Sequence, residues 1–360
     1  MAESFAIGAL ADGAGEARLL APKFNRHTFW CGQSGSGKTY ALGVVLEQLL
    51  LHTRLPMVIL DPNSDFVRLG ETRPGAAAEA ATALAARDIR VRRSGPGSAE
   101  PLKARFVRMP VRSRAAILQM DPVIDAEEFN ALLRLEPLLQ AGLRGHLVDW
   151  LREQPNPAAM RMAQRLENLG VADWDLWAWG DRSITDDIDD RPDAVVADLG
   201  GFAEPGESRA AALAVLDHLW ERREERLGRL IVIDEAHNLC SPDPLTPVDR
   251  LLTERIVQIA AEGRKYGLWL LLSTQRPSKV HPNALSQCDN LALMKMSSRR
   301  DLAELASVFG YAPDALVDRS PSFRQGQALF AGGFVEAAEI VQMGERLTHE
   351  GGSDVRVPLR

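Results

Sequence analysis

The stretch from Gly32 to Thr39 constrains this chain more than any other part of the sequence. It reads Gly-Gln-Ser-Gly-Ser-Gly-Lys-Thr, which fills every fixed position of the Gly-x4-Gly-Lys-Ser/Thr pattern of a phosphate-binding loop. A strand-like run (residues 27–31) enters the loop, and a helix-like run (residues 40–51) leaves it. An ordinary glycine-rich turn is the alternative, but a strand before the loop and a helix after it favour a phosphate site.

The chemistry of this loop suits a nucleoside triphosphate. Its glycines let the backbone approach an anion, so that successive N–H groups and the positive end of the following helix point at the phosphates. Lys38 is expected to reach the β and γ phosphates, and the Thr39 hydroxyl is expected to ligate Mg²⁺. The predicted nucleotide contacts come from Gly32, Gln33, Ser34, Gly35, Ser36, Gly37, Lys38 and Thr39.

Two later segments supply the polar groups that such a site needs. An apolar run (residues 230–233) is followed directly by Asp234 and Glu235. Asp234 would hold the shell of Mg²⁺, and Glu235 would orient and polarise the water that attacks the γ phosphate. Gln275 follows the next apolar run, where its amide could sense the γ phosphate by donating and accepting hydrogen bonds. A plain strand end and a turn residue without contacts are the alternatives for these segments.

Strand-like and helix-like segments alternate along the chain. Nearly continuous apolar runs predict strands at residues 57–60, 194–197, 230–233, 268–272 and 291–294. Helices are expected at residues 208–223, 249–264 and 301–309. Strands of this kind, separated by helices, predict an α/β fold whose mostly parallel sheet is covered by helices on both faces.

The regions outside this pattern divide the chain further. Residues 1–24 resemble a leader with one strand, residues 25–345 would form the main domain, and residues 346–360 would form a tail. Apolar positions at helical spacing between residues 115 and 150 predict a helical insertion at about residues 100–190.

Two unusual segments lie within or beside the predicted insertion. The tryptophans Trp174, Trp177 and Trp179 could form a stacking platform for nucleic acid, but local packing is the favoured interpretation. The acidic run from Asp186 to Asp190 could bind a cation. We expect it to be a solvated loop, because it lacks the glycine-centred spacing of a calcium loop.

Composition limits the class of protein. The chain has 360 residues, enough for one large domain with insertions or for two domains. We expect a cytoplasmic protein without a membrane segment, because no apolar run approaches the length of a membrane span and the three cysteines are far apart. The net charge of −7 argues against a uniformly basic surface for nucleic acid, but it allows a local basic channel.

Taken together, the motifs resemble the HerA/FtsK group of hexameric DNA-pumping ATPases and, within it, the HerA-like proteins. The resemblance extends over roughly residues 25–345, and its last three blocks are more specific than the nucleotide motifs. The blocks are Gly32 to Thr39, Leu60-Asp61-Pro62 with Asp65, Asp234-Glu235-Ala236-His237, Glu262 to Gly267, and Ser273 to Pro277 with Ser286-Gln287-Cys288.

This resemblance implies a RecA-like P-loop core, a homo-oligomeric ring that is expected to be a hexamer, hydrolysis of Mg-ATP between subunits, and double-stranded DNA in the central pore. It implies catalytic roles for Lys38, for Glu235 as the base and for Gln275 as the sensor. It also implies that Arg264 is an arginine finger that reaches the neighbouring subunit's site, a role that suits a forked, permanently charged guanidinium. The alternative for Arg264 is a cation that stabilises a helix end.

The resemblance leaves the biological role open. HerA proteins usually carry a β-barrel ahead of the loop that helps the ring form and docks a nuclease, and we expect the roughly thirty residues ahead of the loop here not to form one. The favoured function is an ATP-driven DNA translocase or helicase-like motor that works with a nuclease or other effector in DNA repair or anti-phage defence. The alternatives are an ATP-dependent scaffold that switches an effector enzyme without moving DNA, and a conjugation- or secretion-type ATPase.

Overall fold

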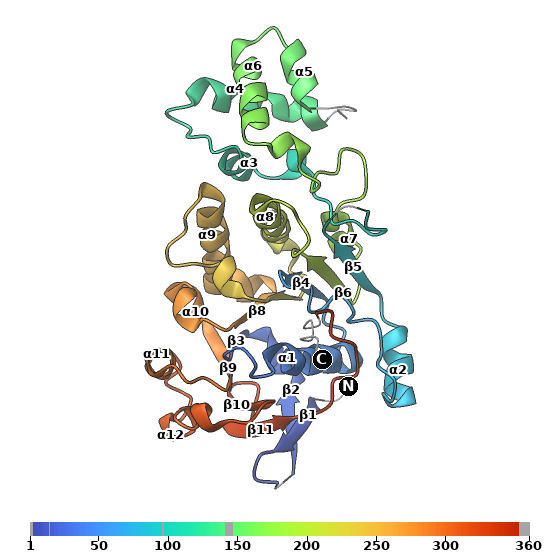
Figure 1. Ribbon diagram of the computed structural model, residues 1–360, viewed down its shortest axis with the longest axis vertical. Coiled ribbons are helices and arrows are strands. Elements are labelled where there is room, and N and C mark those ends of the chain that lie inside the picture. Colours follow the sequence, from blue (N-terminus) through green and yellow to red (C-terminus); the bar gives the residue numbers. More distant parts are fainter. Residues whose placement is uncertain (1–2, 14, 96, 141–146, 353–360) are drawn as a thin grey trace, which may run out of the picture.

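The computed structural model describes residues 3–13, 15–95, 97–140 and 147–352, without the side chains of residues 135–140. In this part of the chain, Figure 1 shows an α/β body from which a group of helices projects at one end. The strands are β1 (Ser4–Leu10), β2 (Glu16–Leu20), β3 (His27–Cys31), β4 (Met57–Asp61), β5 (Ile89–Arg93), β6 (Ala194–Asp198), β7 (Arg229–Ile233), β8 (Leu268–Thr274), β9 (Cys288–Met294), β10 (Gln327–Gly332) and β11 (Glu339–Met343).

These strands form one mixed sheet with the order β2-β1-β11-β10-β9-β3-β8-β7-β4-β6-β5. The pairs from β9 to β5 are all parallel, whereas β10, β11, β1 and β2 pair in antiparallel fashion. All residues of β3, β4, β6 and β7 are buried, as expected for strands covered on both faces. The prediction of a mostly parallel sheet with helices is confirmed, and the parallel strands end at one shared edge.

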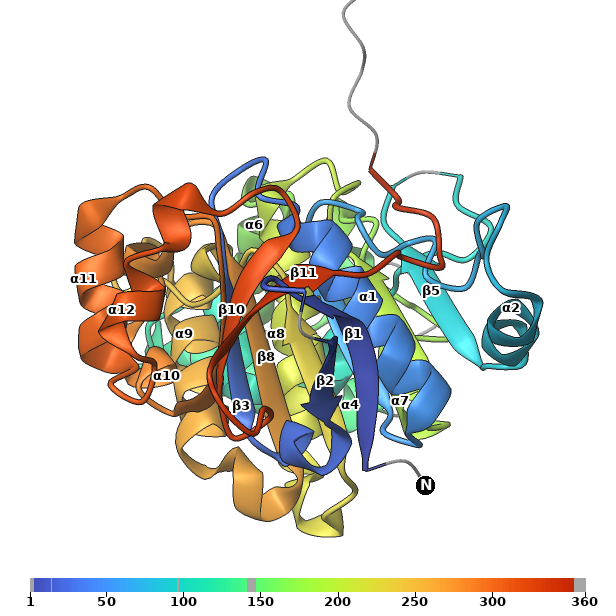
Figure 2. The same cartoon turned by 90° about the horizontal axis from the view of Figure 1, so that it is seen from below.

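The helices are α1 (Lys38–His52), α2 (Ala78–Ala85), α3 (Val111–Ile117), α4 (Ala126–Gln140), α5 (Leu147–Glu153), α6 (Pro157–Asn168), α7 (Ile184–Asp189), α8 (Pro205–Glu221), α9 (Pro247–Glu262), α10 (Pro282–Leu285), α11 (Arg299–Val308) and α12 (Asp314–Val317). Helix α1 packs on one face of the sheet beside β1, and α8 and α9 pack on the other face (Figures 1 and 2). Among the described residues, none of the helices combines the length and apolarity needed to cross a bilayer.

The projecting helices lie within the segment predicted to be a helical insertion. Helices α4 and α5 pack on α6, and α3 contacts α8 and α9 of the body (Figure 1). Ser113 in α3 donates a hydrogen bond to Asp217 in α8, and Asp217 also accepts one from Arg255 in α9 at 2.8 Å. Trp177 is buried and stacks on Trp174 with ring centroids 5.7 Å apart, so these two tryptophans serve local packing.

Segments near both ends of the chain contact the main domain. Residues 4–20 form two strands of the sheet, β1 and β2, because their apolar side chains alternate and point into the core. Near the other end, the carboxylate of Glu47 in α1 accepts hydrogen bonds from the backbone N–H groups of Leu347 (2.7 Å) and Thr348 (2.8 Å). The start of the predicted tail is therefore anchored, and residues 353–360 lie outside the described residues.

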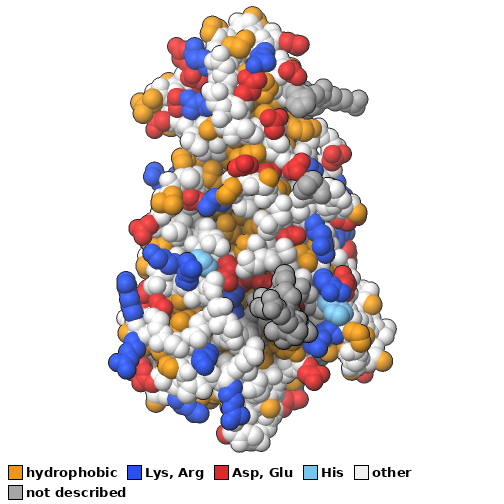
Figure 3. All heavy atoms as spheres, in the orientation of Figure 1, with side chains coloured by type: hydrophobic (Ala, Val, Ile, Leu, Met, Phe, Trp, Pro, Cys, Tyr) orange, Lys and Arg blue, Asp and Glu red, His pale blue; other side chains and the backbone are white. Residues whose placement is uncertain are grey.

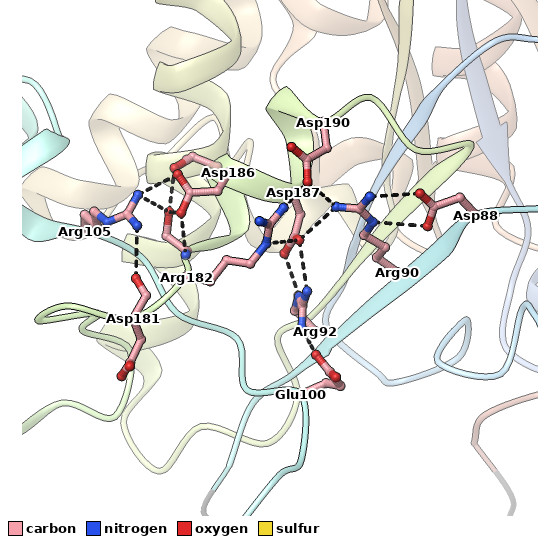
Figure 4. Close-up of polar contacts among 12 residues, drawn as sticks. Asp88, Arg90, Arg92, Glu100, Arg105, Asp181, Arg182, Asp186, Asp187 and Asp190 are labelled. Atoms are coloured by element: carbon pink, nitrogen blue, oxygen red, sulfur yellow. Dashed lines mark hydrogen bonds and ion pairs between the residues drawn. The ribbon is translucent and has the colours of Figure 1, made fainter.

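The acidic run is not the solvated loop that we expected. Asp187 in α7 is fully buried, and it accepts hydrogen bonds from Arg90 (3.2 Å), Arg92 (2.6 Å) and Arg182 (2.8 Å), as Figure 4 shows. The neighbouring Asp186 forms a separate ion pair with Arg105 at 2.6 Å. Arginines from edge strand β5 and from the predicted insertion thus neutralise these carboxylates. We call the ion pairs of Asp187 with Arg90, Arg92 and Arg182 the ionic joint, because they link β5 to α7.

Candidate active site

The glycine loop joins β3 to α1 at the edge where the parallel strands end. Gly35 (φ 76°) and Gly37 (φ 88°) adopt left-handed backbone that favours glycine. A Cβ atom on Gly32 would lie 2.7 Å from both the Met294 Cβ atom and the Ser36 Oγ atom, so only glycine fits there. The loop borders a cavity of about 700 Å³, which is within the size range of small-molecule sites.

Lys38 bridges the glycine loop and the acidic pair. Its ammonium donates hydrogen bonds to Asp234 (2.7 Å) and to the Ser273 hydroxyl (2.9 Å), and it lies 3.2 Å from a Glu235 oxygen. Burial alone lowers the pKa of Lys38, but the charges of Asp234 and Glu235 outweigh it and raise that pKa. The lysine is therefore a charged group that neutralises both carboxylates.

Glu235 is held in an uncommon backbone conformation. Its φ of 45° and ψ of 48° lie in the left-handed region, which is sparsely populated for residues other than glycine and clusters at functional sites. Burial raises the pKa of Glu235. The hydrogen bond from His237 and the charge of Lys38 together lower that pKa by more than burial raises it, so the net shift is downward. The carboxylate is therefore ionised and can accept a proton or orient a water.

Oxygen ligands suited to Mg²⁺ gather beside this pair. One oxygen each from Asp61, Asp65 and Asp234 lie within 4.8 Å of one another, and the Thr39 hydroxyl lies 3.3 Å from Asp65. Asp234 Oδ2 is buried and accepts no hydrogen bond from the described residues. Carboxylates and a hydroxyl are the hard donors that Mg²⁺ prefers, so these residues fit the predicted ion.

Burial also changes the acidity of this group. It raises the pKa of Asp61 to about 7 and that of Asp65 to about 6, with the charge of Asp234 adding to both shifts. Asp61 is held by hydrogen bonds from the backbone N–H groups of Asp65 (3.0 Å) and Phe66 (2.8 Å). Asp61 thus shapes the turn that carries Asp65, whose oxygen faces Thr39.

The structure brings most of the predicted site residues together, with one exception. Gln275 lines the same cavity as the glycine loop and Glu235. Arg264 does not, because it precedes β8 and forms an ion pair with Asp289 at the start of β9. It therefore lies at the opposite edge of the sheet, separated from the cavity by the length of β8.

Several residues that line the cavity were not identified from the sequence. They are Tyr40, Asn63, Gln325, Gly326, Gln342, Met343 and Glu350. Gly326 donates a backbone hydrogen bond to Ser36 of the loop at 2.9 Å, although nearly three hundred positions separate them. The positive φ of Gly326 (75°) is a local feature, but no sequence pattern joins it to the loop.

The fold and this site are those of the RecA-like class of P-loop NTPases. VirB4 of Thermoanaerobacter pseudethanolicus superposes with a TM-score of 0.63 at 17% sequence identity, over 96% of this chain and 97% of that one. The plasmid coupling protein TrwB in complex with the ATP analogue ADPNP superposes with a TM-score of 0.59 at 13% identity, over 98% and 92% of the two chains. At such identities, the superpositions establish the shared fold.

Comparison of sequences relates this chain to a narrower group than the shared fold does. Residues 5–131 match the family described as the central domain of helicase HerA. The DNA double-strand break repair helicase HerA of Sulfurisphaera tokodaii is 31% identical over 144 residues, which are 38% of this chain and 28% of that protein. The HerA protein of Sulfolobus acidocaldarius is 32% identical over 126 residues, which are 35% and 24% of the two chains.

The predicted resemblance to HerA-like ATPases of the HerA/FtsK group is therefore confirmed. The matched region spans only about a quarter of the length of these curated relatives. It contains the glycine loop and the turn with Asp61 and Asp65, whereas Asp234, Glu235 and Gln275 lie beyond the family match.

Proposed function

We propose that this protein hydrolyses ATP at the cavity beside the glycine loop and uses the energy to act on double-stranded DNA. One observation carries the proposal. A glycine loop, a buried lysine and an ionised glutamate, distant in sequence, meet around a single cavity of about 700 Å³. This set of groups matches the chemistry of phosphoryl transfer to water.

The protein's own side chains account for the steps of the reaction. Backbone N–H groups of the loop bind the β and γ phosphates, and Lys38 leaves Asp234 to contact them. Glu235 then orients the attacking water, and Gln275 donates to the γ phosphate or to that water. Thr39 and Asp234 would hold Mg²⁺, which supplies charge neutralisation at the phosphate oxygens.

The assembly is part of the same proposal. We infer a homo-oligomeric ring, expected to be a hexamer, in which Arg264 releases Asp289 and reaches the phosphates bound by a neighbour. Double-stranded DNA would pass through the pore, and a nuclease or other effector would act with the ring in DNA repair or anti-phage defence in the cytoplasm. The similarity to HerA proteins, named as DNA double-strand break repair helicases, supports this inference.

The surface charge bears on how DNA would be held. On the face in Figure 3, basic and acidic side chains are interspersed, which agrees with the net charge of −7. Arg276, Lys279 and His281 follow Gln275 in the sequence and form a small basic group there. We therefore expect DNA contact to be local, at the inner rim of a ring.

The first experiment compares Glu235→Gln with Glu79→Gln, an exposed carboxylate on α2 that serves as a control. Glu235→Gln should bind ATP with wild-type affinity but hydrolyse it at least about 100-fold more slowly, because it cannot accept a proton from water. Glu79→Gln should match the wild type. Full turnover in Glu235→Gln would remove the glutamate from the mechanism.

The second experiment separates a DNA motor from an ATP-dependent scaffold. ATP turnover of the wild-type protein is measured with and without duplex DNA. A motor should be stimulated by DNA, whereas unchanged turnover together with ATP-dependent capture of an effector would favour the scaffold.

A further inference from the structure

A second cavity lies at the edge of the sheet opposite the glycine loop. It has a volume of about 70 Å³ and lies where α7 and α8 end and where β7 and β8 begin. We call it the amino-edge pocket, and its charged lining consists of Arg191, Arg222, Arg223, Arg229, Asp189 and Glu225. Four arginines face two carboxylates in this lining, so its charged side chains carry a net positive charge.

Arg229 is the most buried of these arginines, with 4% of the residue exposed. Its Nη2 atom donates to the Ile188 carbonyl at 2.9 Å. Its Nη1 atom is buried and finds no hydrogen-bond acceptor in the described part of the chain. Burial, with the nearby charge of Arg191, lowers the pKa of Arg229 to about 10, which leaves the guanidinium charged at neutral pH.

Arg223 also lines the pocket and also has an N–H group without an acceptor among the described residues. Its Nη1 atom donates to the Trp220 carbonyl at 2.9 Å, and its guanidinium lies 4.6 Å from the centroid of the Trp220 ring. Its Nε atom is buried without an acceptor among residues 3–352 that are described, and the Glu224 carboxylate is 3.8 Å away. Two buried guanidinium N–H groups in one small pocket therefore lack an acceptor, which is costly unless something supplies it.

The carboxylates of the pocket are already engaged. Asp189 forms an ion pair with Arg222, and its carboxylate lies 2.7 Å from His218 Nε2. Glu225 accepts a hydrogen bond from Arg222 at 2.8 Å. The other acids of the α7 region, Asp186, Asp187 and Asp190, pair with arginines outside this pocket (Figure 4). Among the described residues, these carboxylates therefore supply no hydrogen-bond acceptor to Arg223 Nε or Arg229 Nη1.

We propose that the amino-edge pocket binds a phosphate group. Guanidinium groups match phosphate oxygens in geometry and charge, and Arg223 and Arg229 each have a free N–H for one of them. A cavity of about 70 Å³ has room for a few waters, and hence for one tetrahedral oxyanion but not for a nucleotide. The phosphate comes either from free inorganic phosphate or from a phosphodiester of DNA, and the proposal does not depend on ATP hydrolysis.

The test measures binding of inorganic phosphate by isothermal titration in a buffer without other oxyanions. Arg229→Met and Arg223→Gln should each weaken the phosphate site about tenfold or more, which corresponds to the loss of one charge-assisted hydrogen bond. Phosphate can also bind to the glycine loop. These substitutions do not alter that loop, so its contribution to the titration is the same in all variants. Arg223→Gln keeps the test valid if Arg229→Met fails to fold, because Arg223 is only partly buried.

Arg226→Asn is the matched control. Arg226 is a nearby exposed arginine outside the pocket lining, and asparagine tolerates its left-handed backbone (φ 51°). It should bind phosphate as the wild type does. If wild-type binding does not exceed that of Arg223→Gln, or if Arg226→Asn weakens binding equally, the proposal is overturned.

A second arm distinguishes the two sources of phosphate. Binding of duplex DNA is measured for the same variants at several salt concentrations. If the pocket holds a DNA phosphodiester, Arg223→Gln weakens DNA binding and reduces the slope of log affinity against log salt by about 1. If DNA binding is unchanged while phosphate binding is lost, the pocket is a site for free phosphate.

Discussion

At the scale of single residues, one lysine neutralises the negative charge of the acidic pair in the site. The ammonium of Lys38 neutralises two buried carboxylates, Asp234 and Glu235, and the same ammonium is needed by the phosphates. The lysine is thus held in its charged form before any nucleotide arrives. Binding of ATP exchanges one set of anionic partners for another, and this frees Asp234 for a metal ion.

Lys38→Ala should therefore have two effects. ATP hydrolysis should fall by about 100-fold or more, because a main electrostatic contact with the transferred phosphate is lost. The free energy of unfolding should also fall by about 3 kcal/mol, because two buried carboxylates lose their counter-charge. ATP turnover and denaturant unfolding measure these effects, and wild-type turnover in this variant would rule out the loop assignment.

His27 provides a pH-dependent contribution to stability far from the site. It is fully buried at the start of β3, and its Nδ1 atom accepts a hydrogen bond from the Leu270 N–H group at 2.9 Å. Burial, with the charge of Arg264, lowers the pKa of His27 to about 4. The folded state therefore binds fewer protons than the unfolded state between about pH 6.5 and pH 4.

This stability is fully present above about pH 6.5 and is lost as the pH falls toward 4, by about 3 kcal/mol in total. His27→Asn keeps an acceptor for Leu270 but has no proton to gain, so its unfolding free energy should fall less between pH 7 and pH 5. Denaturant unfolding at both pH values measures the difference. His52→Asn, an exposed control, should behave as the wild type, and an equal acid loss in His27→Asn would contradict the account.

At the scale of elements, the ionic joint around Asp187 attaches edge strand β5 to α7 (Figure 4). Asp187→Asn should lower the unfolding free energy by about 3 kcal/mol, because Arg90, Arg92 and Arg182 lose the buried carboxylate that they share and keep only partly exposed acidic partners. Asp190→Asn is the matched control, since the Asp190 side chain is 44% exposed and its pairs are screened by water. Denaturant unfolding should show a loss below about 1 kcal/mol for the control; equal losses in both variants would contradict the joint.

The buried elements could be predicted from the sequence, and the half-exposed ones could not. Strands β3, β4, β6, β7, β8 and β9 could be predicted because most of their residues are apolar and nearly all are buried. Strand β5 reads Ile-Arg-Val-Arg-Arg, and its arginines make it resemble a charged loop. Arg90 and Arg92 are stabilised in the strand by ion pairs with Asp187 of α7. This contact depends on the tertiary structure and cannot be read from the local sequence.

The same distinction holds for the site. Lys38, Asp234 and Glu235 lie in local motifs, so the sequence predicted them, and the structure brings them within hydrogen-bond distance of one another. Gln325, which lies just before β10, and Gln342 in β11 reach the cavity through the antiparallel part of the sheet. No local pattern encodes that approach. The left-handed backbone of Glu235 was likewise invisible in the sequence.

At the scale of the whole molecule, the proposed catalytic role of Arg264 depends on a second subunit. Because Arg264 and the cavity lie at opposite edges of the sheet, Arg264 can serve catalysis only in trans. Mixing Arg264→Ala subunits with Glu235→Gln subunits should restore part of the ATP turnover, because some interfaces then combine an intact glutamate with an intact arginine. Steady-state ATP turnover of the mixture measures this, and an inactive mixture would contradict the proposed role.

The most direct test of the central claim is a crystal structure with Mg²⁺ and a non-hydrolysable ATP analogue. We predict that the triphosphate lies in the loop from Gly32 to Thr39, with Lys38 moved from Asp234 to the phosphates and Mg²⁺ between Thr39 and Asp234. A triphosphate bound elsewhere, with Lys38 still paired to Asp234, would contradict the account.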